Sequence, residues 1–307
     1  MVTLAAFAQL SPAASSTPWL LSPQRSDALA ASALANRGIL VAIRRNFRQN
    51  DFMEKIGLRG FRRRVLAFFV LITAFAFAFI GLAAAGPGIE KIPAAGGDIQ
   101  LHPINHASFI LEWNGKTIFV DPVGGAEKFK GTPTLILVTD IHGDHLNAGT
   151  LKAVARENTI IIAPEAVASQ LPAELKSQVT VMANGERKEV QGISIEALPM
   201  YNLTPDRLKY HSKGRGNGYV LTLGGKRVYI SGDTEDIPEM RALKNIDLAF
   251  VCMNLPYTMT VEQAASAVKE FKPKIVYPYH FRGSDTEKFK QLVGNASGVE
   301  VRLLKWY

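Results

Sequence analysis

The stretch Thr139-Asp140-Ile141-His142-Gly143-Asp144-His145 places two imidazoles and two carboxylates within six residues, at the end of the apolar run Thr134–Thr139. Such a run is typical of a buried strand, and ligand-bearing loops gather where strands end. Alternate residues in this turn can point at one metal ion while their neighbours point at a second. Imidazole and carboxylate together suit Zn²⁺, Mn²⁺ or iron. The stretch therefore predicts a metal site rather than a merely polar turn.

Two later segments repeat the pattern of a strand followed by a ligand. Ser231-Gly232-Asp233-Thr234 follows the apolar run Arg227–Ile230, so Asp233 stands where a bridging carboxylate would. Tyr277-Pro278-Tyr279-His280 follows Lys274–Val276, which makes His280 a second late ligand. Since ligands at the ends of neighbouring strands meet at one sheet edge, both are candidates for the same metal centre.

Periodicity predicts a layered α/β fold. Hairpin strands, with a tight turn at Asn114-Gly115, come first. Helix–strand alternation is interleaved later, with a second hairpin turn at Gly224-Gly225. This mixture favours sheets covered by helices over a purely parallel sheet. We expect helices at 148–156, 261–269 and 286–293, and strands at 99–103, 108–113, 116–120, 134–139, 159–162, 179–182, 193–198, 218–223, 227–231, 248–252, 275–277 and 299–304.

The order of metal loop, aspartate after a strand and histidine after a strand resembles the metallo-β-lactamase superfamily over roughly residues 97–307. Three further motifs resemble its ascorbate-phosphate-lactonase-like branch. They are Asn105-His106-Ala107-Ser108-Phe109-Ile110-Leu111-Glu112, Val120-Asp121-Pro122, and Gly218-Tyr219-Val220 ahead of Ser231. The resemblance implies a four-layer αββα sandwich of the metallo-β-lactamase type.

Carried over residue by residue, the resemblance implies a site for one or two divalent metal ions. It assigns the first ion to Asp140, His142, a mid-chain ligand and Asp233. The second ion falls to Asp144, His145, Asp233 and His280. In this reading a metal-bound hydroxide attacks an ester, lactone or phosphodiester, Asp144 orients the hydroxide, and His280 or His106 assists proton transfer to the leaving group.

The chain departs from the superfamily pattern at two positions. Asp140 stands where the superfamily usually has histidine. A carboxylate there favours Mn²⁺ or iron over Zn²⁺, or leaves that site weak. The strand 193–199 ends at Asn202, where a histidine is expected, and His211 follows nine residues later. We expect His211 to be the mid-chain ligand, and the alternative is that Asn202 lies near the metal while His211 contacts substrate.

Several residues are candidates for supporting or substrate-binding roles. His106 follows a strand and is either a support for a ligand or a packed histidine. Asp121 is placed to orient a ligand histidine through a hydrogen bond, or else to cap its turn. Arg282, together with Lys213 and Arg215, puts cations near the predicted pocket. These suit a small-molecule substrate carrying a phosphate or carboxylate, although solvated loop charges are the alternative.

Nearly all of the net positive charge lies at the start of the chain. The net charge is +8, but residues 1–85 hold ten basic and three acidic residues, and the other 222 hold 25 basic and 24 acidic. A near-neutral body lacks the basic surface that phosphate-backbone binding needs, so no nucleic acid is expected as a partner. The single cysteine, Cys252, excludes an intrachain disulfide.

The basic region resembles an export leader. Residues 65–85 form a segment of 21 residues without a charge, which is long enough to span a bilayer as a helix. The segment directly follows Arg62-Arg63-Arg64. The segment is either a signal peptide cut near Ala85 or an uncleaved membrane anchor, and Met53 would start it with a basic n-region. We therefore divide the chain into an extension or wrongly assigned start (1–52), a signal peptide or anchor (53–85), a linker (86–96) and a hydrolase domain (97–307).

Together these features predict an exported metal-dependent hydrolase, located in the periplasm or anchored to the membrane with its domain outside the cytoplasm. Two alternatives remain. One is a nuclease of the same superfamily, which the near-neutral body and the leader disfavour. The other is a non-catalytic or single-metal envelope protein of the same fold, suggested by Asp140 and Asn202.

Overall fold

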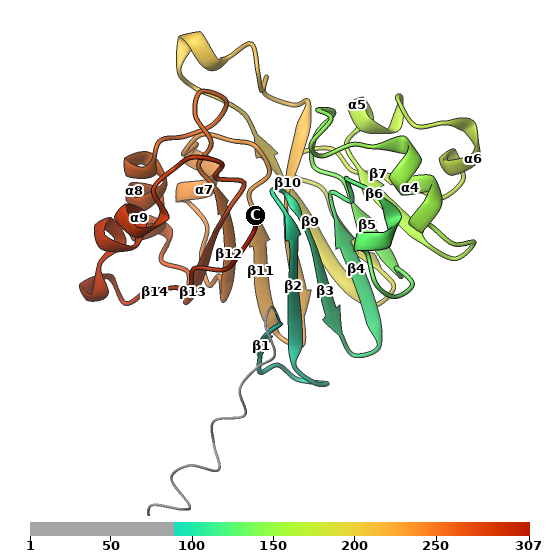
Figure 1. Cartoon of the computed structure of the whole chain (residues 1–307), viewed down its shortest axis with the longest axis horizontal. Helices are drawn as coiled ribbons and strands as arrows, with labels where there is room; N and C mark the ends of the chain where they lie inside the picture. The colour runs from blue at the N-terminus through green and yellow to red at the C-terminus, as the bar shows by residue number, and fades with distance from the viewer. Residues whose placement is uncertain (1–88) are drawn as a thin grey trace, which may run out of the picture. The chain divides into compact units, whose positions relative to one another are not determined.

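The structure is a computed structural model that describes residues 89–307. The predicted extension and leader, residues 1–85, lie outside this range. Within it, no helix is long and apolar enough to cross a membrane. The described residues form two seven-stranded sheets with helices on their outer sides (Figure 1).

The first sheet follows the order of the chain from β1 to β7. Its first four strands are antiparallel, and from β4 onward neighbouring strands are parallel. The strands are β1 (Glu90–Ile92), β2 (Ile99–Asn105), β3 (Ser108–Trp113), β4 (Lys116–Val120), β5 (Leu135–Leu137), β6 (Ile160–Ala163) and β7 (Val179–Val181).

The second sheet has the same design. Strands β8 to β11 pair antiparallel, and β11 to β14 pair parallel. Its strands are β8 (Arg187–Val190), β9 (Ile193–Met200), β10 (Gly216–Leu223), β11 (Lys226–Ile230), β12 (Leu248–Cys252), β13 (Ile275–Tyr279) and β14 (Glu300–Val301). Both sheets are therefore mixed, which agrees with the predicted order of hairpins followed by helix–strand alternation.

Alternation along the strands divides the core into two parts. Phe109 of β3 faces the second sheet and stacks on Phe250 of β12, with ring centroids 4.4 Å apart. Its neighbour Ile110 points the other way, into a cluster with Leu151 of α4 (Ala148–Val154). Because successive strand residues face opposite sides, one sheet can pack on the other sheet and on helices at the same time.

Helices cover the outer face of each sheet (Figure 1). Helix α8 (Val261–Phe271) begins with a capping box in which Thr260 and Gln263 satisfy each other's backbone N–H groups, as their spacing in the sequence predicts. The helices α5 (Glu165–Ala168) and α6 (Ala173–Lys176) accompany α4, while α7 (Pro238–Arg241) and α9 (Thr286–Val293) accompany α8. Short 3₁₀ helices lie at Ala126–Lys128, Pro205–Arg207 and Asn295–Ser297.

One predicted boundary is wrong. Residues 86–96 were expected to form a linker, but β1 lies within them and pairs with β2. Glu90 of β1 forms an ion pair with Arg302, which lies 212 residues later in the chain. Because this contact is so distant in sequence, no local pattern predicts the strand.

Candidate metal centre

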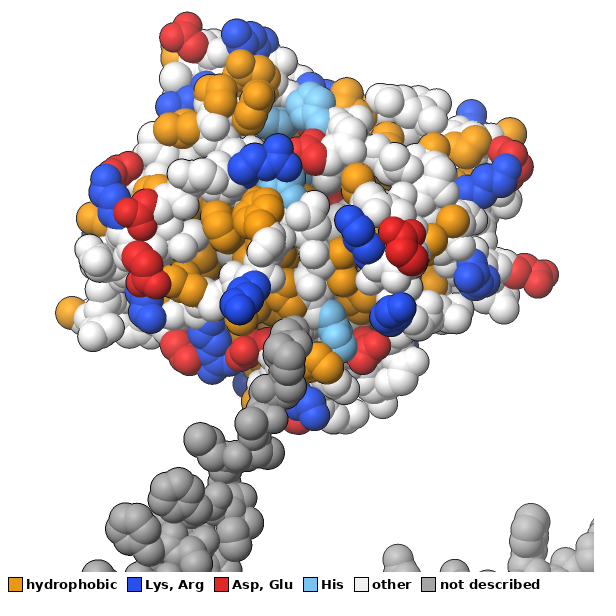
Figure 2. Space-filling view, in the orientation of Figure 1, with side chains coloured by type: hydrophobic (Ala, Val, Ile, Leu, Met, Phe, Trp, Pro, Cys, Tyr) orange, Lys and Arg blue, Asp and Glu red, His pale blue; other side chains and the backbone are white. Residues whose placement is uncertain are grey.

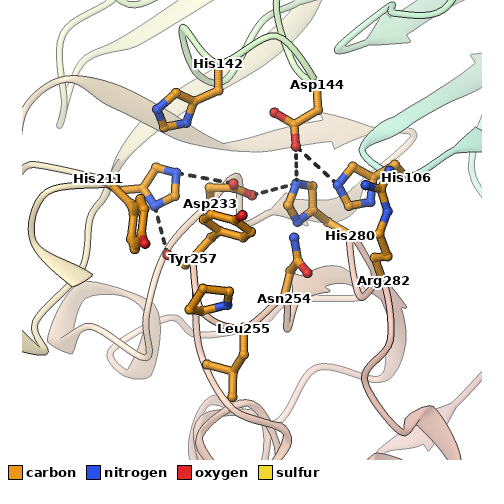
Figure 3. A pocket seen from close by; sticks show the side chains of 12 residues that line it. His106, His142, Asp144, His211, Asp233, Asn254, Leu255, Tyr257, His280 and Arg282 are labelled. Atoms are coloured by element: carbon orange, nitrogen blue, oxygen red, sulfur yellow. Dashed lines mark hydrogen bonds and ion pairs between the residues drawn. The ribbon is translucent and has the colours of Figure 1, made fainter. Parts of the chain in front are cut away.

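The predicted ligands come close together in loops that follow strands. Figure 3 shows His142, Asp144, His211, Asp233 and His280 around one pocket. The loop after β5 supplies Asp140, His142, Asp144 and His145. Asp233 follows β11, His280 follows β13 directly, and His211 lies in the long connection between β9 and β10. Because β11 and β13 flank β12 in a parallel array, their carboxyl ends meet at the same edge.

One cluster gathers Asp140, His142 and His211, with one ligand atom of each within 4.8 Å of the others. His142 Nδ1 lies 2.8 Å from Asp140 Oδ2, and His211 Nε2 lies 3.7 Å from the same oxygen. Asp140 is fully buried, whereas the His142 side chain is 40 % exposed. The cluster is therefore open to a cavity on the His142 side.

A second cluster gathers His145, Asp233 and His280, and Asp144 Oδ2 lies 3.2 Å from His280 Nε2. Asp233 joins the two clusters. Its Oδ2 is 3.3 Å from both His145 Nε2 and His211 Nε2, and its Oδ1 is 3.3 Å from His280 Nε2. A carboxylate in this position can contact two cations at once, as the sequence predicts for a bridging ligand.

Several polar atoms of these side chains have no hydrogen-bond partner and are suited to bind divalent metal ions. His145 Nε2, His211 Nε2 and Asp233 Oδ1 are buried and have no hydrogen-bond partner. The other ring nitrogens are held: His145 Nδ1 lies 2.8 Å from Asp121 Oδ2, and His211 Nδ1 lies 3.1 Å from the carbonyl of Tyr257. Donating Nδ1–H to an oxygen leaves a lone pair on Nε2, which is how metal-ligating histidines are oriented.

The ionisable groups stabilise one another strongly. Burial alone would raise the pKa of Asp233, but the charges of His280 and His145 and the close approach of His145 and His211 hold it well below its usual range. Burial alone would lower the pKa of His145, yet the charges of Asp233 and Asp121 raise it well above its usual value. Asp233 is therefore ionised, in the form that binds metal, whereas His145 has to release a proton from Nε2 when it binds.

Asp121 contacts both His145 and Thr139. Its Oδ2 also accepts from the Thr139 hydroxyl at 2.7 Å, and its Oδ1 accepts from the Thr139 amide at 2.8 Å. Burial raises the pKa of Asp121, and the charge of His145 opposes this. Asp121, His106 and His280 all have positive φ, between 42° and 53°, a region that non-glycine residues seldom adopt and that is frequent at functional sites.

Asn202 is a support for His211. Its amide nitrogen lies 3.3 Å from His211 Nδ1, and it donates to the carbonyls of Tyr257 at 2.7 Å and Arg207 at 2.9 Å. These contacts tie the His211 loop to the segment after β12. The geometry therefore favours His211 over Asn202 as the mid-chain ligand.

Two of the three predicted substrate cations are engaged by acidic side chains. Arg215 donates hydrogen bonds to both carboxylate oxygens of Asp140, from Nε at 3.2 Å and from Nη2 at 3.0 Å. Lys213 lies 2.9 Å from Glu239. The expectation that they face an anionic substrate is wrong for both, because carboxylates already neutralise them. Of the three, only Arg282 lines the cavity.

The cavity above the ligands has a volume of about 480 Å³. One face of the molecule shows histidine side chains beside basic and hydrophobic ones near its upper edge (Figure 2). Sequence reasoning missed the wall made by the segment 254–257 and by Tyr210, whose ring packs at 5.0 Å from that of Tyr257. Nothing in the local sequence distinguishes these residues, since only the fold brings them to the ligands.

Two mixed sheets packed face to face, with buried histidines and aspartates at one edge, define a metallohydrolase of the metallo-β-lactamase fold. Residues 100–280 match the beta-lactamase superfamily domain. A UPF0173 metal-dependent hydrolase of Pyrococcus abyssi is 34 % identical over 221 residues, covering 66 % of this chain and 96 % of that protein. The chain belongs to the metallo-β-lactamase superfamily and, within it, to the UPF0173 family of metal-dependent hydrolases.

Solved structures agree with this assignment. A protein of Parabacteroides distasonis described as a metal-dependent hydrolase is 40 % identical, with a TM-score of 0.66, and the match covers 72 % of this chain and all of that one. Igni18, a metallo hydrolase of Ignicoccus hospitalis, shares the fold at 23 % identity and a TM-score of 0.57, covering 67 % of this chain and 95 % of that one. The protein is a metal-dependent hydrolase, and its clusters suggest a binuclear site.

Proposed function

We propose that the protein is a binuclear hydrolase that cleaves an ester, lactone or phosphodiester bond in a small molecule. Asp140, His142, His211 and Asp233 would hold the first ion. Asp144, His145, Asp233 and His280 would hold the second. The observation that carries the proposal is the position of Asp233, whose two oxygens contact histidines of both clusters at 3.3 Å. Zn²⁺, Mn²⁺ and iron all suit this donor set.

When bound, divalent ions at this centre would lower the pKa of a water molecule toward neutrality and polarise the bond under attack. The chain's own residues supply the rest. Asp144 is 43 % exposed on its side chain and reaches the cavity, where it can orient the attacking water. His106 and His280 line the same cavity and lie beside Asp144. His106, which is assigned to neither ion, can pass a proton to the leaving group, and His280 can do so where it does not hold the second ion.

Two features of the cavity argue for an anionic substrate with an apolar part. Arg282 lines one side and can pair with a phosphate or carboxylate. Leu255 and Tyr257 line the other and are 46 % and 45 % exposed. We include lactones and phosphodiesters among the proposed substrates because three sequence motifs resemble the ascorbate-phosphate-lactonase-like branch.

Metal analysis paired with a substrate panel tests this function. We expect two equivalents of metal per chain in protein purified without chelator, and loss of turnover on chelation that Zn²⁺ or Mn²⁺ restores. The panel should pair anionic and neutral members of the phosphodiester, lactone and ester classes, with the anionic members turned over faster. Metal-free protein as purified would rule out the hydrolytic centre, and one tightly bound ion without turnover would support the single-metal envelope protein instead.

We further propose that the domain is exported, because an uncharged segment of 21 residues follows three arginines before it. Expression of the full chain followed by cell fractionation should place it outside the cytoplasm. N-terminal sequencing then separates cleavage near Ala85 from a retained membrane anchor. Recovery of the intact chain in the cytoplasmic fraction would contradict export.

A further inference from the structure

Tyr307 lies 201 residues from His106 in the chain, yet its hydroxyl oxygen lies 2.5 Å from His106 Nδ1. The same oxygen is 3.2 Å from the backbone nitrogen of Phe281 and 3.0 Å from that of Arg282. These two residues directly follow His280. Tyr307 therefore joins two segments of the centre that the sequence keeps far apart.

The segment that carries Tyr307 is fixed in place by its neighbour. Trp306 is 1 % exposed and packs edge-on against Phe109 of the first sheet, with ring centroids 5.8 Å apart. Its carbonyl accepts from the His106 amide at 3.3 Å, and the His106 carbonyl in turn accepts from the His280 amide at 3.1 Å. The tyrosine hydroxyl is thus presented to His106 by a rigid frame.

Hydrogen-bond accounting decides where the protons lie. The amides of Phe281 and Arg282 can only donate, so the Tyr307 oxygen accepts from both. The hydroxyl proton is then left to donate, and the remaining neighbour is His106 Nδ1. If Nδ1 carried a proton, three donors would converge on one oxygen, and the O–H could donate only to solvent. Nδ1 is therefore the acceptor.

The other side of the His106 ring fits this tautomer. His106 Nε2 lies 3.2 Å from Asp144 Oδ2, and an ionised carboxylate can only accept. With Nδ1 as the acceptor, the proton of the neutral ring lies on Nε2. A nitrogen that bears a proton cannot bind a metal ion, and Nδ1 is occupied by Tyr307. His280 Nε2 also lies 3.2 Å from Asp144 Oδ2, but its Nδ1 is buried without a partner, so no such contact fixes its tautomer.

We propose that Tyr307 is a positioning residue: its hydroxyl holds His106 as the Nε2–H tautomer, so that His106 orients Asp144 and is not itself a metal ligand. This inference rests on the proposed function, which assigns Asp144 to the second ion. The proposal gives His106 and His280 different roles, although their rings stack with centroids 3.7 Å apart. Asp144 and His280 then remain as ligands, and the chain from Tyr307 through His106 fixes the direction of the carboxylate.

The test is ¹⁵N spectroscopy of the histidine rings in the full-length protein, metal-free and loaded with Zn²⁺, with His106→Gln identifying the His106 signals. In the wild type we expect a protonated Nε2 and an unprotonated, hydrogen-bonded Nδ1, in both states. Tyr307→Phe removes only the hydroxyl and should give a mixture of tautomers. Because losing such a support costs about 10–100-fold in metal affinity or activity, Zn²⁺ binding at the second site should weaken to that extent.

Tyr277→Phe is the matched control, since it removes a hydroxyl from β13 that faces Glu90 and Arg302 rather than the centre. It should leave the His106 signals and Zn²⁺ affinity unchanged. A protonated Nδ1 in the wild type, or a large shift of Nε2 when Zn²⁺ is added, would overturn the proposal and make His106 a ligand. The tautomer is measured without turnover, so this result tests the role of Tyr307 independently of the hydrolytic function. With a substrate in hand, Tyr307→Phe should lower kcat and leave KM unchanged.

Discussion

Asp233→Asn is expected to empty both metal positions and to lower kcat/KM by more than about 100-fold. This exceeds the loss of about 10–100-fold that follows when only a contact supporting a ligand is removed. The asparagine keeps the shape of the side chain but loses its charge. In Asp233 the two oxygens face His145, His211 and His280, each at 3.3 Å. An amide would present its NH₂ group to some of these nitrogens, and a neutral oxygen attracts a divalent cation far less than a carboxylate.

The measurement is metal content after gel filtration, together with kcat/KM for the best substrate of the panel. Asp206→Asn is a suitable control because Asp206 is an exposed carboxylate in the loop between β9 and β10. Circular dichroism should show that the Asp233 variant is folded. If the variant keeps two metal ions and activity within tenfold of the wild type, Asp233 does not bridge them.

The second large effect concerns Asp140 and Arg215. The guanidinium binds both oxygens of a fully buried carboxylate, so the pair presents a nearly neutral oxygen donor, much as an imidazole presents a neutral nitrogen. Burial alone would raise the pKa of Asp140, but a hydrogen bond from His142 and the charges of His145, His142 and Arg215 lower it. Arg215 and Asp140 are therefore expected to act as one unit.

Asp140→His alone should lose the first metal ion, because the guanidinium would face an imidazole and a cation with no carboxylate to balance it. Arg215→Met alone should destabilise the metal-free protein, since breaking a buried ion pair costs about 3–5 kcal/mol. The double variant, Asp140→His with Arg215→Met, should regain the first ion and bind Zn²⁺ in preference to Mn²⁺, because nitrogen has replaced oxygen as the donor.

Competition titrations with a chelator, using Zn²⁺ and Mn²⁺ separately, measure these affinities, and thermal unfolding of metal-free protein measures the stability. The two substitutions should be strongly non-additive, as expected for residues in direct contact. Additive losses in the double variant, or tighter binding in Arg215→Met alone, would mean that Arg215 competes with the metal instead of supporting Asp140.

Local patterns predicted the strands well because each one encodes which of its faces is buried. The predicted bounds 108–113, 116–120 and 248–252 are those of β3, β4 and β12, and 286–293 are those of α9. The short strands β1 and β8 were missed, since three or four residues with a single buried side chain in each strand carry little periodic signal. Their pairing partners hold them in place.

Local sequence patterns predict the metal loop 139–145 and the order of Asp233 and His280 after it, because these ligands follow apolar strands, and the same motifs resemble the superfamily to which the chain belongs. The contacts that support these ligands are visible only in the folded chain. Arg215 reaches Asp140 across 75 residues, and Tyr307 reaches His106 across 201. Contacts made by single side chains at such separations leave no periodicity or spacing in the chain, so they become visible only when the two sheets have brought their edges together.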